Sequence, residues 1–287
     1  MTWAKLLANI DGGPASEAVA GVALELGRSF DARVELLHVE VAEEEAIPIV
    51  AEGMAAGAVG RMLEGLAEQR RIRAETAERL YRTLCVEAGV PTCAPDDPAE
   101  PGRFRVGFRR LAGRESDEIS RRGRLADLVI VGGATEEGEF SPAVEAAIFG
   151  TGRPLIMVPP SAATRFGAHV AIAWDGSPGA GRATGAALPL LRRAERVTVA
   201  TADMEKLGTK PSALVGYLAE HGIAAKTWAF RPDDGKLGER LLAEAEAAGA
   251  DLLVMGAYGH SRLREMVLGG VTQSVTAKAR LPVFMAR

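Results

Sequence analysis

The sequence predicts an α/β fold made of two tandem, doubly wound parallel-sheet sandwich domains. Short apolar runs alternate with helical stretches along the chain, and the order of these segments repeats between the two halves. The length of 287 residues is comfortable for two domains. Continuous apolar strands that alternate with helices indicate a parallel sheet covered on both faces. Right-handed crossovers then place helices on both sides of that sheet.

Four pairs of segments match between the halves in the same order. Each half has an apolar run followed by Asp-Gly, an Arg-Val run, an Ala-Asp pair before a run that ends in glycine, and a proline-led apolar run. The matching pairs are residues 10–14 and 174–178, 33–39 and 196–202, 126–132 and 250–256, and 154–158 and 282–286. We therefore predict a tandem duplication, with domains over residues 1–161 and 165–287.

The first half carries a longer insertion after its second strand. Residues 40–60 are acidic and alanine-rich, and we expect a mobile surface segment there. Residues 60–87 have near-helical spacing of apolar positions and predict one long amphipathic helix. After the turn-rich residues 96–102, residues 104–111 form the expected middle strand. The basic cluster over residues 103–114 is offset by nearby acids, which favours an exposed strand face.

The second half shows a more regular alternation of strands and helices. The expected strands cover residues 169–174, 196–202, 224–230, 251–256 and 282–286. The expected helices cover residues 179–193, 212–221, 237–248 and 270–279. In such sheets, ligands bind at the carboxyl ends of strands near the switch in strand order. Asp175 and Gly256 both follow or end strands, so both are expected to line that crevice.

Residues 251–272 contain a glycine pattern typical of a phosphate-binding loop. An apolar run ends at Gly256, Gly259 follows, and after a nine-residue spacer Gly269 and Gly270 open a helix-like segment. Glycine lets the backbone approach an anion, and the free N–H groups of a helix N-terminus point at it. The ordered set is more specific than any single glycine.

This ordered set resembles the universal stress protein family. Nucleotide-binding members carry Gly-x-x-Gly, nine residues, then Gly-Ser or Gly-Thr after the fourth strand, and an aspartate at the end of the first. The resemblance spans the chain as a tandem pair, close in the second half and degenerate in the first. It implies a Rossmann-like, adenine nucleotide alpha hydrolase-like fold that binds ATP, with Mg²⁺ as an optional companion.

The resemblance implies a set of binding residues in the second half. They are Ala173, Asp175, Ala202, Gly256, Gly259, Arg262, Gly269, Gly270, Val271 and Thr272. Asp175 matches the aspartate near adenine and ribose, and the two alanines match backbone positions around the base. The glycines match the phosphate loop, Val271 and Thr272 match the first turn of the phosphate-facing helix, and the arginine offers a cation in the spacer.

Two departures from the family pattern bear on binding. Gly270 stands where the family prefers serine or threonine, and one lost hydroxyl hydrogen bond weakens binding by about 1 kcal/mol. In the first half, Thr135 replaces the second loop glycine. The closing proline follows the loop glycine after 154 − 132 = 22 residues there, against 282 − 256 = 26 in the second half. The acidic residues 134–139 would repel phosphate, so we expect one nucleotide site per chain.

Several plainer interpretations stand beside the nucleotide site. Asp11 and Asp175 are equally explained as helix N-caps, and the four histidines show no metal-ligand spacing. The second hypothesis for function is a universal stress protein module with a vestigial site that acts through protein–protein interaction. A third, weaker one is an enzyme of the adenine-nucleotide α-hydrolase-like group. The loop offers no general base, so we expect a non-enzyme that signals by binding and hydrolyses ATP slowly at most.

Composition and edge strands indicate the compartment and the partners. The net charge of −4 argues against a nucleic-acid partner. No run approaches the ~18 apolar residues that span a membrane, and Cys85 and Cys93 fit reduced thiols. We therefore expect a cytoplasmic protein without membrane or nucleic-acid partners. Residues 154–158 and 282–286 are edge strands that we expect to pair inside the chain as a pseudo-dimer, while the helix over residues 60–87 leaves room for homodimerisation.

Overall fold

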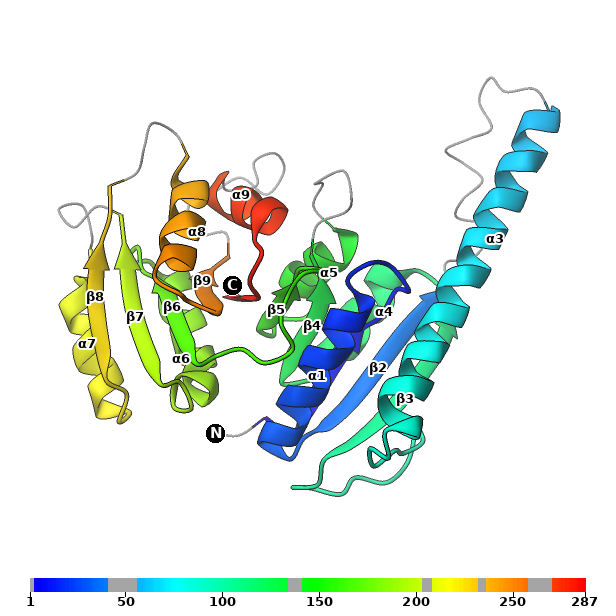
Figure 1. Cartoon of the computed structure of the whole chain (residues 1–287), viewed down its shortest axis with the longest axis horizontal. Helices are drawn as coiled ribbons and strands as arrows, with labels where there is room; N and C mark the ends of the chain where they lie inside the picture. Colours follow the sequence, from blue (N-terminus) through cyan, green and yellow to red (C-terminus); the bar gives the residue numbers. More distant parts are fainter. Residues whose placement is uncertain (1–2, 41–55, 134–140, 203–207, 232–235, 258–269) are drawn as a thin grey trace.

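The computed structural model describes residues 3–40, 56–133, 141–202, 208–231, 236–257 and 270–287, with side chains from residue 61 onward in the second of these ranges. Residues 41–55 of the expected mobile segment lie outside the described residues, whereas residues 56–60 already belong to a helix, so the prediction is wrong there. Within the described ranges, the chain forms one ten-stranded sheet with helices on both faces (Figure 1). The predicted α/β class is confirmed.

The strands of the sheet match the predicted runs to within a residue or two at most ends. They are β1 (Lys5–Asn9), β2 (Arg33–Glu40), β3 (Arg105–Ala112), β4 (Leu128–Gly132), β5 (Leu155–Val158), β6 (His169–Ala173), β7 (Arg196–Thr201), β8 (Ala225–Ala229), β9 (Leu252–Gly256) and β10 (Val283–Ala286). Their buried apolar side chains on both faces explain the continuous hydrophobic runs in the sequence.

The strand order of one half repeats in the other. The sheet runs β3-β2-β1-β4-β5-β10-β9-β6-β7-β8, so each half has its first strand in the middle and its fifth strand at the join. The pairs within each half are parallel, and β5 pairs antiparallel with β10. The predicted pairing of these two strands inside the chain is confirmed, and it relates the halves by a pseudo-two-fold axis.

The helices divide between the two faces of the sheet. They are α1 (Ser16–Phe30), α3 (Ala56–Tyr81), α4 (Glu115–Gly123), α5 (Pro142–Gly150), α6 (Pro178–Leu191), α7 (Pro211–Glu220), α8 (Leu237–Ala247) and α9 (Gly270–Lys278). One core joins α1, α3, α6 and α7 to the first face. The other core joins α4, α5, α8 and α9 to the opposite face. Each half is therefore a three-layer sandwich.

Aromatic side chains from both halves meet at the join between them. Phe284 of β10 is fully buried and stacks on Trp3 of the first half, with ring centroids 6.3 Å apart. Trp3 also contacts Phe30 at the end of α1, at 4.8 Å. On each face of the sheet, side chains of both halves therefore belong to the same hydrophobic core.

An aspartate ties the loop before each central strand in the same way in both halves. Asp127 accepts backbone hydrogen bonds from Ala4 at 2.7 Å and from Lys5 at 3.0 Å. Asp251 accepts from Gly167 at 2.9 Å and from His169 at 3.0 Å. These are the aspartates of the repeated Ala-Asp pairs, so their recurrence in the sequence reflects a shared structural role.

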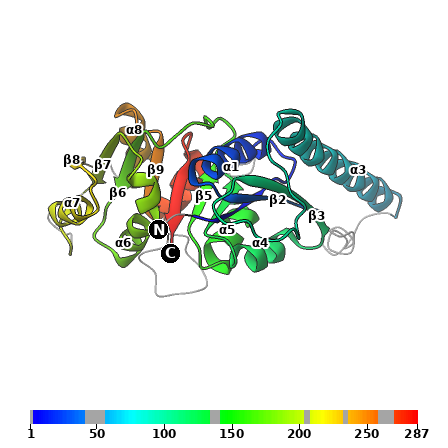
Figure 2. The same cartoon turned by 90° about the horizontal axis from the view of Figure 1, so that it is seen from below.

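Helix α3 extends beyond the sheet at one end of the molecule (Figure 2). It begins at Ala56, before the predicted start, and becomes π-helical over Arg82–Glu87 instead of remaining α-helical. This wider turn buries Cys85 completely. It follows Tyr81, which stacks on Phe108 of β3 at 5.2 Å.

Candidate functional site

The candidate site lies where strand order switches in the second half. β6 pairs with β7 on one side and with β9 on the other. The chain leaves β6 toward α6 on one face of the sheet and leaves β9 toward α9 on the other. The carboxyl ends of β6 and β9 therefore lie side by side at the edge where doubly wound sheets bind ligands, and we call this edge the crevice.

Small residues end the strands at this crevice. Ala173 ends β6, Gly256 ends β9, and Ala202 directly follows β7; all three are partly exposed. A Cβ atom on Gly256 would lie 2.6 Å from the backbone nitrogen of Ala180 and from the carbonyl carbon of Gly179. Glycine at position 256 therefore lets β9 pass directly against the first turn of α6, so this residue has a packing role whether or not a ligand binds.

Asp175 shapes the loop between β6 and α6. Its Oδ1 atom accepts a hydrogen bond from the backbone N–H of Ser177 at 2.9 Å. The N-cap of α6 is Ser177, whose hydroxyl oxygen accepts from the backbone of Ala180 at 3.1 Å. The interpretation of Asp175 as the N-cap is therefore wrong. The serine takes that position, and the aspartate tightens the turn before it.

A buried tryptophan, Trp174, fixes the start of the loop between β6 and α6. Trp174 is 8% exposed, and its indole N–H donates to the carbonyl of Thr209 at 2.9 Å. The hydroxyl of Thr201, at the end of β7, donates to the Trp174 carbonyl at 2.9 Å. A Cβ atom on Gly176 would lie 3.0 Å from the Thr209 backbone nitrogen, and the φ angle of this glycine is +70°. The loop backbone at Asp175 is therefore fixed from both sides.

The predicted phosphate loop is described only at its two ends. Gly256 ends β9, and Gly270, Val271 and Thr272 form the first turn of α9. Gly270 is exposed, whereas Thr272 is buried and its carbonyl accepts from the hydroxyl of Thr276 at 3.0 Å. The remaining predicted site residues, Gly259, Arg262 and Gly269, lie outside the described residues. The predicted set of site residues stays a prediction.

The corresponding crevice of the first half is built differently. Asp11 is drawn into its own loop, where its Oδ1 atom accepts from the Gly13 N–H and from the Ser16 hydroxyl, each at 2.8 Å. The N-cap of α1 is Ala15, so the capping interpretation of Asp11 is also wrong. A Cβ atom on Gly12 would lie 2.2 Å from the Arg73 carbonyl oxygen. The long helix α3 therefore closes over this loop.

A buried amide and carboxyl pair occupies the end of β1. Asn9 is 4% exposed and donates from Nδ2 to Oε1 of Glu115, the first residue of α4, at 2.8 Å. Its Oδ1 atom accepts no hydrogen bond from the part of the chain that the structure describes. Burial raises the pKa of Glu115, with the Asn9 hydrogen bond opposing the shift and the charge of Asp11 adding to it. Asn9 occupies the position that Ala173 holds in the second half.

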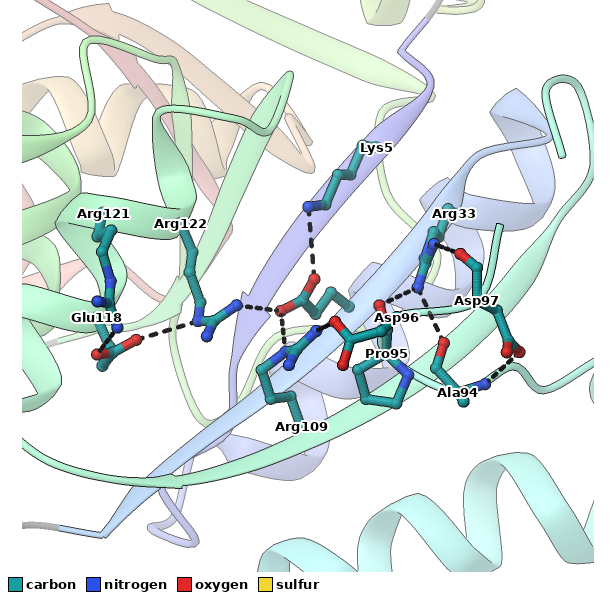
Figure 3. Close-up of polar contacts among 11 residues, drawn as sticks. Lys5, Arg33, Ala94, Pro95, Asp96, Asp97, Arg109, Glu118, Arg121 and Arg122 are labelled. Carbon is teal, nitrogen blue, oxygen red and sulfur yellow. Dashed lines mark hydrogen bonds and ion pairs between the residues drawn. The ribbon is translucent and has the colours of Figure 1, made fainter. Parts of the chain in front are cut away.

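A second polar cluster lies near the amino-terminal ends of the first-half strands and was missed in the sequence. Glu35 of β2 is 2% exposed. Its carboxylate contacts Lys5 at 3.4 Å, Arg109 at 3.0 Å and Arg122 at 3.3 Å. Figure 3 shows these three cations converging from two strands and a helix. A lone glutamate in an apolar run, Arg33–Glu40, was the signal that could have revealed this buried ion cluster.

The prediction of an exposed basic face over residues 103–114 is confirmed at Arg103, Arg110 and Arg114, which are exposed, and is wrong at Arg105 and Arg109. Arg109 also contacts Asp96 at 2.7 Å (Figure 3), which raises the pKa of Arg109. Arg105 is 5% exposed, pairs with Glu100 at 2.8 Å and donates to the carbonyl of Pro98. The turn after the long helix folds back over β3, so these arginines are enclosed by it. Their acidic partners Asp96 and Glu100 lie on the exposed side of this turn.

The described residues show neither a metal-ligand group nor a membrane-spanning helix. No group of three or more potential ligands is arranged to hold a metal ion within the described ranges. None of the helices in those ranges has the length and hydropathy needed to cross a bilayer.

Comparison with known proteins points to one family. Residues 168–287 match the model of the universal stress protein family. The C-terminal half is therefore similar to a universal stress protein domain. A universal stress protein of Synechocystis sp. is 42% identical over 53 residues, which are 18% of each chain. One from Methanocaldococcus jannaschii is 37% identical over 49 residues, which are 17% of this chain and 30% of the relative. The matched segments thus cover less than a third of either curated relative.

Solved structures extend the fold likeness over the whole chain. A universal stress protein from Archaeoglobus fulgidus DSM 4304 aligns with a TM-score of 0.66 at 16% identity, covering 99% of this chain and 96% of that one. A putative universal stress protein from Pseudomonas aeruginosa UCBPP-PA14 aligns with a TM-score of 0.56 at 13% identity, covering 99% and 93%. Both halves therefore share the universal stress protein fold, and the predicted resemblance is confirmed.

Proposed function

We propose that the C-terminal universal stress protein domain binds an adenine nucleotide, ATP, in the crevice between the ends of β6 and β9. The observation that carries the proposal is that the neighbouring strands β6 and β9 end in two small residues, Ala173 and Gly256, at the same edge of the sheet. Small residues leave room for a planar base and a ribose beside Asp175. The backbone N–H groups at the start of α9 are available for phosphate oxygens, and the helix dipole favours an anion there.

Binding depends on backbone more than on side chains at the phosphate end. Gly270 lacks the hydroxyl that a serine or threonine would offer. Thr272 is buried, so its hydroxyl is a poor substitute. We expect Gly259 and Gly269 to let the loop approach the phosphates, with Arg262 as the cationic contact.

The first half serves as a scaffold without a nucleotide site of its own in this proposal. Its crevice holds Asn9 and Glu115 where a base would need space, and α3 covers the loop at Gly12. The chain then binds one ATP, acts by binding and signalling, and turns the nucleotide over slowly, as expected of a cytoplasmic stress-response protein.

Calorimetric titration of the whole chain with ATP tests the site. We expect one ATP per chain, and loss of binding in Gly259→Val, because a branched side chain prevents close approach of the loop. The matched control is Thr135→Val, at the corresponding position of the first half, which should bind as the wild type does. ATP at 100 times its Kd should also stabilise the folded chain by about 2.7 kcal/mol in a thermal melt.

Two results would contradict the proposal. Absence of binding to the wild-type chain at millimolar ATP would leave the interaction module with a vestigial site as the better account. Two equivalent ATP molecules per chain, with one lost in Thr135→Val, would show that the first half had kept its site.

A further inference from the structure

One face of α3 carries uncharged side chains and stands away from the sheet. Met62 is 40% exposed and Ile72 is 49% exposed, both high for large apolar side chains. Between them lie Gln69, which is exposed, and Gly65, whose missing Cβ would have no atom of the described chain within 4 Å. We call Met62, Gly65, Gln69 and Ile72 the outer seam.

The outer seam has the spacing of a coiled-coil contact. Its residues are separated by three, four and three positions, which places them along one side of a helix. The side of α3 that packs on the protein is a different one, marked by the buried residues Ala74 and Ala77. Among the described residues the seam is therefore left exposed after α3 has packed on its own domain, and it belongs to the helix that extends beyond the sheet (Figure 2).

We propose that the outer seam binds the outer seam of a second copy of this chain, as an antiparallel helix pair about a two-fold axis. The three-four-three spacing is symmetric about its centre. An antiparallel copy of the helix therefore places its own seam residues opposite these ones. Met62 faces the partner's Ile72 at each end of the seam. Gly65 faces the partner's Gln69 in the middle, where the open space at the glycine admits the longer amide side chain.

Charges beside the seam agree with this register. Arg61 precedes the seam and comes next to the partner's Glu75, which gives two opposite-charge contacts per dimer. Glu68 lies near the axis beside its own copy, but Arg71 already bonds Glu68 at 2.7 Å and Glu75 at 2.6 Å along the helix. These arginines reduce the repulsion between the central carboxylates.

A second copy fits better than an extended strand or a flat partner. In the described structure, strands β5 and β10 are paired inside the chain, so their edges are not open to another copy. The seam is narrow, apolar at both ends and self-complementary, which are properties of an isologous contact. The proposal goes beyond nucleotide binding and does not rest on it.

Sedimentation velocity of the full chain over a range of micromolar concentrations tests the dimer. We expect a reversible species of twice 30.1 kDa, or 60.2 kDa. Ile72→Glu should raise the dimer dissociation constant by about 100-fold, because each dimer then buries two charged groups against Met62. The matched control is Leu125→Glu, at an apolar side chain that is 75% exposed outside α3, which should dimerise as the wild type does.

Cross-linking tests the register and does not depend on the glutamate variant folding. In a Cys93→Ser background, Met62→Cys with Ile72→Cys should give a covalent dimer on mild oxidation, since each cysteine meets the other one of the partner. Met62→Cys alone and Ile72→Cys alone should stay uncross-linked, and Cys85 is buried.

Each remaining outcome overturns the proposal. A monomer at all concentrations excludes a self-association, and a dimer that Ile72→Glu leaves intact places the interface elsewhere. Covalent dimers from the single-cysteine variants would show a parallel pairing. Rescue gives a last check: Arg61→Glu should weaken the dimer, and adding Glu75→Arg should restore it, whereas failure to restore contradicts the antiparallel charge contact.

Discussion

Truncation of Phe284 to alanine tests whether the two halves unfold as one unit. Phe284 is fully buried at the β5–β10 join, opposite Ile156 in the register and stacked on Trp3. Truncating a buried phenylalanine costs about 3–5 kcal/mol through lost burial and the cavity that remains. Loss of the ring pair with Trp3 is part of that cost, so we take about 4 kcal/mol as the expected loss.

The shift in the thermal midpoint depends on how much of the chain unfolds together. For all 287 residues, an unfolding entropy of about 2.1 cal/mol/K per residue gives about 0.6 kcal/mol/K, so the midpoint should fall by about 7 °C. If only the 120 residues from 168 to 287 unfolded as a unit, the same loss would lower their midpoint by about 16 °C. The first half would then keep its own midpoint.

Scanning calorimetry distinguishes these cases. We expect a single transition in the wild type and in Phe284→Ala, with the smaller of the two shifts. The control is Phe149→Ala, at a phenylalanine that is 42% exposed and contacts the guanidinium of Arg287, where the midpoint should change little. Two separate transitions, with the first half unaffected by the loss of Phe284, would refute the reasoning that the join makes one cooperative core.

Two carboxyl groups give further expectations. Glu35→Gln should cost about 3 kcal/mol by chemical denaturation, because it leaves buried cations such as Arg109 short of a counter-charge; a change below 1 kcal/mol, about the effect of a surface pair, would contradict this. Burial raises the pKa of Glu115 above its ordinary value of 4.5. Between pH 4.5 and the raised pKa, the folded chain therefore binds more protons than the unfolded chain. The stabilisation that this group contributes therefore falls as pH rises through that window. The free energy of unfolding of Glu115→Gln should consequently rise relative to that of the wild type from acidic to alkaline pH. Parallel pH profiles of the free energy of unfolding for the wild type and Glu115→Gln would exclude the effect.

Much of the fold was predictable because the hydrophobic periodicity and the residues that mark segment ends agree along the second half. The run ending at Gly256 and the helix from Leu237 were expected within a residue of their observed bounds, since apolar strands and alanine-rich helices alternate without interruption. The π-helical turn after Tyr81 was not predictable, because α- and π-helical turns share similar local sequences and the choice depends on burying Cys85. Arg105 was taken as exposed because a sequence does not reveal which turn folds back over it.

The candidate site was predictable where backbone geometry demands particular residues. The sequence placed Ala173 and Gly256 at strand ends with Asp175 just after one, and in the structure those two strands are neighbours that end at the same edge of the sheet. The part played by Ser177 in capping α6 was missed, because Asp175 offers an equally good cap in sequence. Glu115 was also missed, since its partner Asn9 is over a hundred residues away and no local pattern connects them.

Joining β5 to β10 within one chain makes the contact between the halves independent of protein concentration. A dimer of separate domains loses this sheet on dilution, whereas a tethered pair keeps it at a high effective concentration. The tether also removes the requirement that both sides be identical, because each half is encoded separately. One crevice can then accept Asn9 and a covering helix while the other keeps small strand ends. Loss of ligand binding on one side need not weaken the sheet that the other side depends on.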